Sequence, residues 1–323
     1  MSVMAAETKA TQPHSKYDHL IASAKAVPEV PTIVVHPCDE SSLRGAIDAA
    51  EAGIIKPILV GPVAKIRDTA AKFALDIGGF EIVDAPHSEA AAARSVELIH
   101  AGKGEALMKG SLHTDELMRS VTAKGTGLRT SRRISHVFIM DVPAYSETLF
   151  ITDAAINIFP DLDSKRDIVQ NAIDLYNQAG FGTTPRVAIL SAVETVTSAI
   201  PSTLEAAALC KMADRGQITG GLLDGPLAFD NAIDMEAARI KGIKSEVAGR
   251  AQILLVPDLE AGNMLAKNLA YFAKADSAGI VLGARVPVVL TSRADSARAR
   301  MASCAVAAIY ADARRRRAPI AAA

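Results

Sequence analysis

The segment TIVVHPCDESSLRGAIDAAEAGIIKPILVG, residues 32–61, decides the fold class, because a helical pattern stands between two short apolar runs. The runs TIVVH and PILVG are typical of buried strands. The stretch SSLRGAIDAAEAG between them predicts a helix with Ser41 or Ser42 as its N-cap and Gly53 as its stop. Strand, helix and strand in this order, with continuous apolar strands, indicate a parallel sheet that is covered on both faces. We therefore expect an α/β fold.

The same alternation continues along the chain, with one break in the middle. AKIRDTAAKFAL predicts a helix, FEIVDA a strand, and SEAAAARSVELIHAG a helix capped near Ser88 and stopped by Gly102. The runs SHVFIMDVP and LFITDAAIN then follow each other closely, which is the spacing of a hairpin rather than of a helical crossover. Helices and strands alternate again up to a last strand, VPVVLTS, and a helix from Ser296 to about Arg315. The pattern predicts two α/β units, the second beginning near Asp141.

Composition disfavours several classes of protein. Half of the 323 residues are hydrophobic and 22% are charged, so the chain can bury a substantial core. The formal net charge of −1 argues against nucleic-acid binding driven by global charge, and 4% aromatics without Trp disfavour base stacking. A polyanionic ligand would therefore be held by local arginines rather than by the field of the whole molecule.

The cysteines and the N-terminus indicate the compartment. Cys38, Cys210 and Cys304 are far apart and form no CxxC pair, so we expect neither a disulfide framework nor a thiolate zinc site, and a reducing cytoplasmic location. The N-terminus lacks an apolar signal core, and no apolar run approaches the ~18 residues needed to span a bilayer. We expect a flexible leader over residues 1 to about 15 and no membrane partner.

Ligands of open α/β sheets bind where strands end in polar loops, and four such junctions stand out. They are KGSLHTDELMRS from Lys109, SAVETVTSAIPST from Ser191, VPDLEAGNMLAK from Val256 and LTSRADS from Leu290. In LTSRADS, a hydroxyl-rich loop that opens a helix offers backbone N–H groups to an anion, and Arg293 adds a planar fork of donors. The competing interpretation is that Ser292 or Ser296 only caps the helix and that Arg293 pairs with Asp295.

Other arginines also have two interpretations. Arg119 follows Asp115 by four residues at an expected helix start, so an ion pair within the helix competes with anion binding. Arg129, Arg132 and Arg133 cluster just before a strand, where an anion site competes with a solvated loop. The arginines of ADARRRRAP complement the end of a helix and remain in water, and we take them as structural.

Several common signatures do not occur in the sequence. There is no GxxxxGK[ST] loop and no GxGxxG after the first strand, so ATP hydrolysis and ordinary dinucleotide binding lose support. The motifs HExxH and GxSxG do not occur either, which weighs against a zincin or an α/β-hydrolase. We expect metal-independent chemistry without a bound cofactor, carried out by arginines and hydroxyl groups.

Seven segments, in order along the chain, together resemble the phosphate acetyltransferase and butyryltransferase family. They are DAPHSEAAAARSVELI, ALMKGSLHTDELMRSV, GLRTSRRISHVFIMDVP, ITDAAINIFPDL, DGPLAFDNAI, VPDLEAGNMLAKNL and VPVVLTSRADS. The resemblance covers roughly Pro31 to Tyr310, and its longer motifs are specific. It is strongest to the branch often fused behind an enoyl-CoA hydratase domain.

The resemblance implies both an activity and an architecture. The family interconverts acyl-CoA and inorganic phosphate with acyl phosphate and free CoA, so CoA is a substrate rather than a bound cofactor. The family fold resembles isocitrate and isopropylmalate dehydrogenase, with two α/β domains and the active site in the cleft between them. Domain I would comprise residues 1–140 and 283–323, and domain II, which is expected to form the dimer, residues 141–282. Homodimers or larger assemblies are usual in the family.

The resemblance also assigns roles to particular residues. Ser292 matches the serine proposed to form a hydrogen bond in the transition state, and Arg293 matches the arginine that holds phosphate. Arg119 matches an arginine placed at the phosphate or CoA. The family's proposed thiol base is an aspartate seven residues after the serine, where this chain has Ala299. Asp295 is the obvious substitute, although it could equally cap the helix, and deprotonation of the thiol without a protein base competes with it.

The remaining site candidates and the competing functions complete the hypothesis. Thr291, Ser296, Arg129 and Arg133 are candidates for binding phosphate or CoA. The form TSRADS is closer to the butyryltransferase branch, so phosphate butyryltransferase activity on C3–C4 acyl-CoA is one alternative to an acetyltransferase. The departure at Ala299 motivates a second, an acetyl-CoA-sensing module without turnover. A decarboxylating dehydrogenase is a weaker third, because its metal-binding aspartates and NAD site are not found in the sequence.

Overall fold

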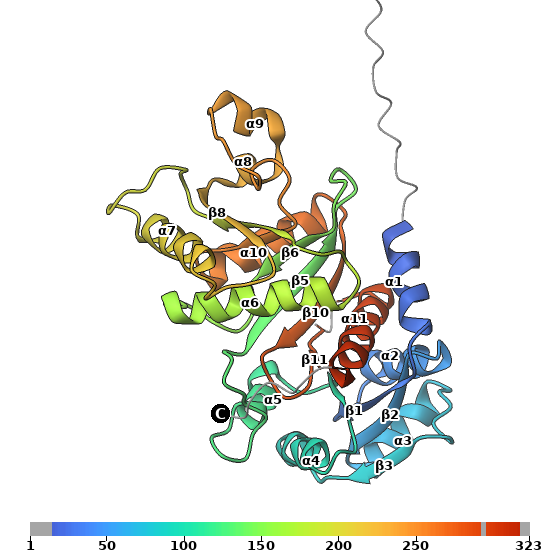
Figure 1. Cartoon of the computed structure of the whole chain (residues 1–323). Coiled ribbons are helices and arrows are strands. Elements are labelled where there is room, and N and C mark those ends of the chain that lie inside the picture. Colours follow the sequence, from blue (N-terminus) through green and yellow to red (C-terminus); the bar gives the residue numbers. More distant parts are fainter. Residues whose placement is uncertain (1–14, 292–294, 317–323) are drawn as a thin grey trace, which may run out of the picture.

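The computed structural model describes residues 15–291 and 295–316, which form an α/β fold around one sheet of eleven strands (Figure 1). The elements of the first half are α1 (Ser15–Lys25), β1 (Val30–Val35), α2 (Glu40–Glu51), β2 (Ile55–Gly61), α3 (Val63–Lys72), β3 (Glu81–Asp84), α4 (Ser88–His100), β4 (Ala106–Lys109), α5 (Thr114–Val121) and β5 (Ser135–Asp141). The second half contains β6 (Leu149–Thr152), α6 (Leu162–Gln178), β7 (Arg186–Leu190), α7 (Pro201–Asp214), β8 (Leu222–Leu227), α8 (Phe229–Ile233), α9 (Met235–Ile240), β9 (Ile253–Leu255), α10 (Leu259–Tyr271), β10 (Asp276–Leu282), β11 (Val288–Val289) and α11 (Ala297–Arg315).

The sheet has the strand order β3, β2, β1, β4, β11, β10, β5, β6, β9, β7, β8. Neighbouring strands run parallel from β3 to β11 and again from β6 to β8. The central pairs, β11 with β10, β10 with β5, and β5 with β6, are antiparallel. The two outer groups of strands therefore run in opposite directions. The prediction of an α/β fold with a mainly parallel sheet is confirmed.

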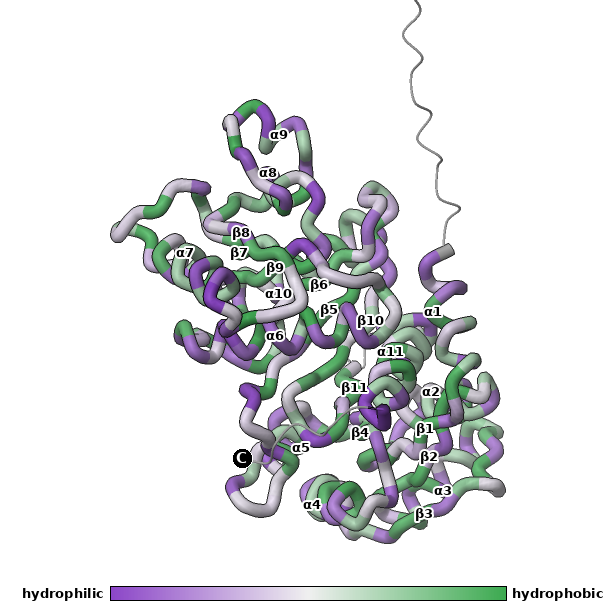
Figure 2. Tube along the Cα trace, in the orientation of Figure 1, coloured by the Kyte–Doolittle hydropathy of each residue, from purple (hydrophilic) through white to green (hydrophobic). Residues whose placement is uncertain are grey.

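One face of the sheet carries a single continuous core, whereas the opposite face carries two separate ones. On the first face, helices α1, α2, α3, α6, α7 and α11 pack in one cluster that includes Val137 and Ile280 of the central strands. On the opposite face, α4 and α5 pack around Leu107 and Val281, while α8, α9 and α10 pack around Leu254 in a second cluster. Figure 2 shows that hydrophobic residues gather along the strands. The gap between the two cores lies over the centre of the sheet.

The predicted helices are found, but two of their caps differ by one to three residues. Asp39, not Ser41 or Ser42, caps α2, since its carboxylate accepts the Ser42 N–H at 2.8 Å. His87 rather than Ser88 caps α4. The glycine stops are correct, because Gly53 and Gly102 have φ values of 71° and 72° that other residues rarely adopt.

Five elements were not predicted, and two of them are the short helices α8 and α9 between β8 and β9. Helix α1 begins at Ser15, the last residue of the expected leader. The rest of that prediction, residues 1–14, lies outside the described part of the chain. Strand β4 was noticed only as an apolar run before a polar junction. Strand β10 was missed altogether, although it lies between β11 and β5. The expected hairpin is confirmed by the antiparallel pairing of β5 with β6.

The division into two domains remains a prediction, because the sheet is continuous across the expected boundaries. Strand β11 returns beside β4, where Val288 pairs with Leu107. Helix α11 packs against both α2 and α6, so it contacts the helices of both halves.

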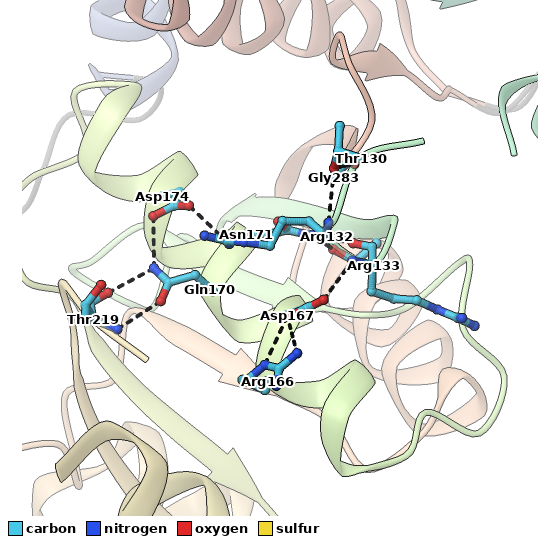
Figure 3. Close-up of polar contacts among 11 residues, drawn as sticks. Thr130, Arg132, Arg133, Arg166, Asp167, Gln170, Asn171, Asp174, Thr219 and Gly283 are labelled. Carbon is cyan, nitrogen blue, oxygen red and sulfur yellow. Dashed lines mark hydrogen bonds and ion pairs between the residues drawn. The ribbon is translucent and has the colours of Figure 1, made fainter. Parts of the chain in front are cut away.

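A polar network ties the segment before β5 to helix α6 (Figure 3). The buried amide of Asn171 donates to the Arg133 carbonyl at 2.8 Å and to Ser135 Oγ at 2.9 Å. Arg132 Nη1 lies 3.3 Å from the Asp174 carboxylate, and the Arg133 N–H donates to Asp167 at 2.9 Å. These contacts fix the strand that enters the centre of the sheet.

Replacing Asn171 by alanine should therefore destabilise the fold. The Asn171→Ala variant leaves the Arg133 carbonyl and the Ser135 hydroxyl without their donor, at a cost of about 1–3 kcal/mol in the free energy of unfolding. Urea titration measures this loss. The matched control is Asn268→Ala, because Asn268 is exposed on α10 and its amide donates to the Met264 carbonyl of the same helix. Equal stability of the two variants would contradict the structural role of Asn171.

Candidate functional site

A cleft of about 520 Å³ lies over the central strands, where the gap between the two cores on that face leaves the sheet uncovered. Its floor is formed by β5, since residues 136, 138 and 140 alternate onto the same side of the strand. Its walls come from the start of α5, from α10 and from the segment after β11. The lining residues are Lys109, Leu112, His113, Thr114, His136, Phe138, Met140, Ala155, Asn263, Ala266, Lys267, Ala270, Tyr271, Ser277, Leu290, Thr291 and Asp295.

Three of the four polar junctions noticed in the sequence contribute to this cleft. The junctions after β4 and β11 do so at the carboxyl ends of parallel strands, as expected for an open α/β sheet. The junction after β9 contributes through the later turns of α10, including Asn263 and Lys267. The junction from Ser191 supplies no lining residue, because β7 lies near the far edge of the sheet.

The charged residues of the cleft suit an anionic ligand. Lys109 and Lys267 line it together with one carboxylate, Asp295. The Lys109 side chain is buried, and its ammonium group donates to the carbonyls of Gly110 and Leu112 at 3.2 and 3.1 Å. Lys109 and Lys267 place positive charge at the cleft, which attracts anions.

Described residues of the LTSRADS segment lie at the cleft. Thr291 is buried, Asp295 is half-buried, and both line the cleft. Ser296 instead caps α11, because its hydroxyl accepts the Ala299 N–H at 3.1 Å, which is the structural alternative considered above. Ser292 and Arg293 lie outside the described residues. Their roles remain predictions.

The other candidate arginines do not line the cleft. Arg119 is 68% exposed and lies 3.3 Å from Glu89 and 3.9 Å from Asp115, so the predicted ion pair within α5 is present. Arg129 is exposed, and its backbone forms a bridge with Ala284. Arg133 extends away from the network of Figure 3, and its Nε donates to Asn157 at 2.7 Å. Binding of phosphate or CoA by these arginines stays a prediction.

His136 is the cleft residue that sequence reasoning missed. Its side chain is 1% exposed, and burial lowers its pKa to about 3, so the imidazole is neutral near pH 7. The edge of its ring meets Phe138, with the ring centres 4.4 Å apart. A histidine inside an apolar run is usually part of a core, and the only available signal was its position two residues from Phe138 on the same face of the strand.

The described residues, 15–291 and 295–316, contain neither a cluster of metal-ligating side chains nor a membrane-spanning helix. No three His, Cys, Asp or Glu side chains there are close enough together to hold a metal ion. In the same ranges no helix is both long and apolar enough to cross a membrane.

Comparison with known proteins gives a consistent picture. Residues 90–308 match the family model described as phosphate acetyl/butaryl transferase. The chain is 74% identical over 308 residues to a phosphate acetyltransferase of Rhizobium meliloti, covering 95% of this chain and 97% of that protein. It is 45% identical over 273 residues to a phosphate butyryltransferase of Clostridium acetobutylicum, covering 84% and 90%. A branched-chain phosphotransacylase from Enterococcus faecalis V583 has a similar structure, with a TM-score of 0.75, 27% identity and coverage of 87% and 98%.

Burial of a neutral His136 predicts a pH dependence of stability. The unfolded imidazole binds a proton below about pH 6.5, whereas the native one does so only near pH 3, so acidification between these values favours unfolding. The wild-type protein should lose up to about 1.4 kcal/mol per pH unit more than His136→Gln in this window. Urea unfolding at pH 7, 6 and 5 measures the difference. Parallel slopes for the two proteins would contradict a buried neutral imidazole.

Proposed function

The chain belongs to the phosphate acetyl- and butyryltransferase family, and on that premise we propose that it catalyses the reversible reaction of acetyl-CoA with phosphate. The products are acetyl phosphate and free CoA. The acetyl group is supported by 74% identity to a phosphate acetyltransferase over nearly the whole chain, against 45% to a phosphate butyryltransferase.

The observation that carries the proposal is the cationic cleft over the centre of the sheet. Phosphate, acetyl phosphate and CoA are all anions, and Lys109 and Lys267 line the same space as Thr291 and Asp295. Thr291 and Asp295 belong to TSRADS, which is part of the segments that carry the family resemblance. Two residues of the segment expected to act on the substrate thus share the cleft with cations that attract anions.

The proposed roles follow the resemblance. Arg293 holds the phosphate group, and Ser292 donates to the transition state. Arg119, Arg129, Arg133 and Ser296 are kept as candidates for the parts of CoA that extend beyond the cleft.

Asp295 is proposed as the base for the CoA thiol. It lies half-buried at the cleft, whereas the backbone of Ala299, in the position of the family aspartate, takes part in the first turn of α11. Deprotonation of the thiol without a protein base stays the competing route.

Direct transfer between CoA and phosphate is favoured over an acyl-cysteine intermediate. Burial raises the pKa of Cys38 to about 11 and the pKa values of Cys210 and Cys304 to about 12. Thiols with such pKa values are almost fully protonated near neutral pH, and the protonated thiol is a poor nucleophile. CoA itself then supplies the attacking sulfur.

The proposal includes a cytoplasmic location and a homodimer or larger assembly. Free cysteines at three separate positions suit a reducing compartment. The expectation of an assembly, formed through residues 141–282, comes from the family resemblance, and light scattering of the purified protein tests it.

Purified protein mixed with acetyl phosphate and CoA should form a thioester, which is followed by its absorbance. Rates with acetyl-, propionyl- and butyryl-CoA plus phosphate separate an acetyltransferase from a butyryltransferase. The Arg293→Ala variant should lose about 100-fold in kcat/KM for acetyl phosphate, because it lacks a charge-assisted contact to the phosphate. Arg94→Ala, on the exposed face of α4, is the matched control.

The alternative to turnover is a sensing module. Acetyl-CoA binding by calorimetry without any thioester formation from C2 to C4 acyl phosphates would replace the enzyme proposal by that alternative. Equal activity of Arg293→Ala and Arg94→Ala would remove Arg293 from the site.

Lys109 should contribute to phosphate affinity. The Lys109→Gln variant keeps a donor for the two carbonyls but loses the charge, so the KM for phosphate should rise about tenfold with a smaller change in kcat. Initial rates at varied phosphate measure this effect. Lys103→Gln, which removes an exposed lysine away from the cleft, should behave as the wild-type protein. An unchanged KM in a folded Lys109→Gln variant would exclude contact between Lys109 and phosphate.

A further inference from the structure

The floor of the cleft contains a polar side chain, His136, with a ring nitrogen that has no hydrogen-bond partner in the part of the chain that the structure describes. His136 is 1% exposed, and its Nδ1 has no hydrogen-bond partner among the described residues. Its Nδ1 is completely buried in this state. A buried polar group without a partner costs about 1–3 kcal/mol, so such groups are rare unless something else satisfies them.

The packing around His136 holds the ring in place without bonding to it. Phe138 meets the ring edge to face on the same strand. On the neighbouring strand, a Cβ built at Gly279 would lie 3.0 Å from His136 Nε2 and 3.1 Å from the Leu290 carbonyl oxygen. A larger residue at this position would crowd the ring. The imidazole is thus fixed at the cleft floor by shape, between β10 and the lining residue Phe138.

His136 is neutral near pH 7, in contrast to the charged lysines of the cleft. Burial lowers its pKa to about 3, and no charged side chain contributes to that shift. The ring is neutral near pH 7, so it adds no charge for binding phosphate. A neutral imidazole N–H is instead a donor suited to a carbonyl oxygen, because it stabilises developing negative charge without giving up its proton.

We propose that His136 is a catalytic residue that donates a hydrogen bond to the carbonyl oxygen of the acyl group during transfer. This inference rests on the proposed function and adds a group that the family resemblance did not assign. It places the acyl carbonyl on the floor of the cleft and the phosphate group toward the lysines.

The step balances without a change in the protonation of His136. The CoA sulfur forms a bond to the carbonyl carbon of acetyl phosphate, and an electron pair moves onto the carbonyl oxygen, where the His136 N–H stabilises it. The pair then returns as the bond between the carbonyl carbon and the phosphate oxygen breaks. The proton of the thiol ends on the released phosphate. In the reverse direction phosphate attacks the thioester carbonyl in the same place.

Two substitutions of similar size test the donor. His136→Leu removes the hydrogen bond, and His136→Gln keeps an N–H donor but cannot act as a base near neutral pH. The Leu variant should lose about 100-fold in kcat, with less than a threefold change in the KM values for acetyl phosphate and CoA. The Gln variant should stay within about tenfold of the wild-type kcat, and its profile of kcat/KM against pH should keep the wild-type shape.

Other results would overturn the inference. A Leu variant within threefold of the wild-type kcat would show that the ring only fills space. A Gln variant as inactive as the Leu variant, or one in which the acid limb of the pH profile is lost, would point to a base instead of a donor. Circular dichroism and urea titration establish that each variant is folded.

A measurement on the wild-type protein covers the case in which a variant does not fold. With ¹⁵N-labelled histidine, the ring signals of His136 should show a neutral imidazole, and acetylphosphonate, which keeps both a carbonyl and a phosphoryl group, should shift them. Unchanged signals at saturating acetylphosphonate would overturn the inference. If the wild-type protein forms no thioester at all, the proposed function is wrong. If the protein is active but acetylphosphonate does not shift the His136 signals, only the proposed role of His136 is wrong.

Discussion

The antiparallel pairing of β5 with β10 is the interaction on which the molecule depends. Seven residue pairs join these strands, from Asp276 with Asp141 to Leu282 with Ser135. The pairing links two groups of parallel strands that run in opposite directions, so neither group ends in an exposed edge at the centre. Because residues 142–275 lie between the two strands in sequence, the pair can form only when the second half has folded back on the first.

This constraint explains why the site is open on one face and closed on the other. On the closed face, α11 follows the returning strands and packs against both α2 and α6, which makes one core. On the open face, α5 belongs to the first group of strands and α10 to the second, and the cleft lies between these helices over residues of β5 and β10. The floor of the cleft is therefore built from the same strands that hold the two halves together.

The sequence predicted what depends on local pattern and missed what depends on distant partners. Alternating apolar and helical segments predicted the α/β class and most elements. Strand β10 escaped because it begins Asp-Ser-Ala-Gly, residues with little preference for strands, and follows an alanine-rich helix without a clear break. Its antiparallel pairing with β5 could not be inferred, since β5 lies more than a hundred residues earlier.

Prediction of the site from the sequence is limited in the same way. The polar junctions identified Thr291 and Asp295, since the carboxyl end of a strand is a local feature. The environment of Arg133 depends on Asp167 and Asn157, which belong to elements further along the chain. No local pattern distinguishes these contacts from an anion site.

The cleft combines lysines, which attract anions by their charge, with a neutral histidine, His136. A net charge of −1 gives the whole chain little attraction for anions, so the lysines must act where the ligand lies. Their charge favours phosphate in both substrate and product, which helps binding more than it helps the chemical step. Rate depends on what the transition state has and the ground state lacks, which here is the charge on the carbonyl oxygen. A neutral donor held in place by Phe138 and Gly279 can stabilise that charge without binding the phosphate more tightly. In the proposed mechanism, the buried ring of His136 is this donor.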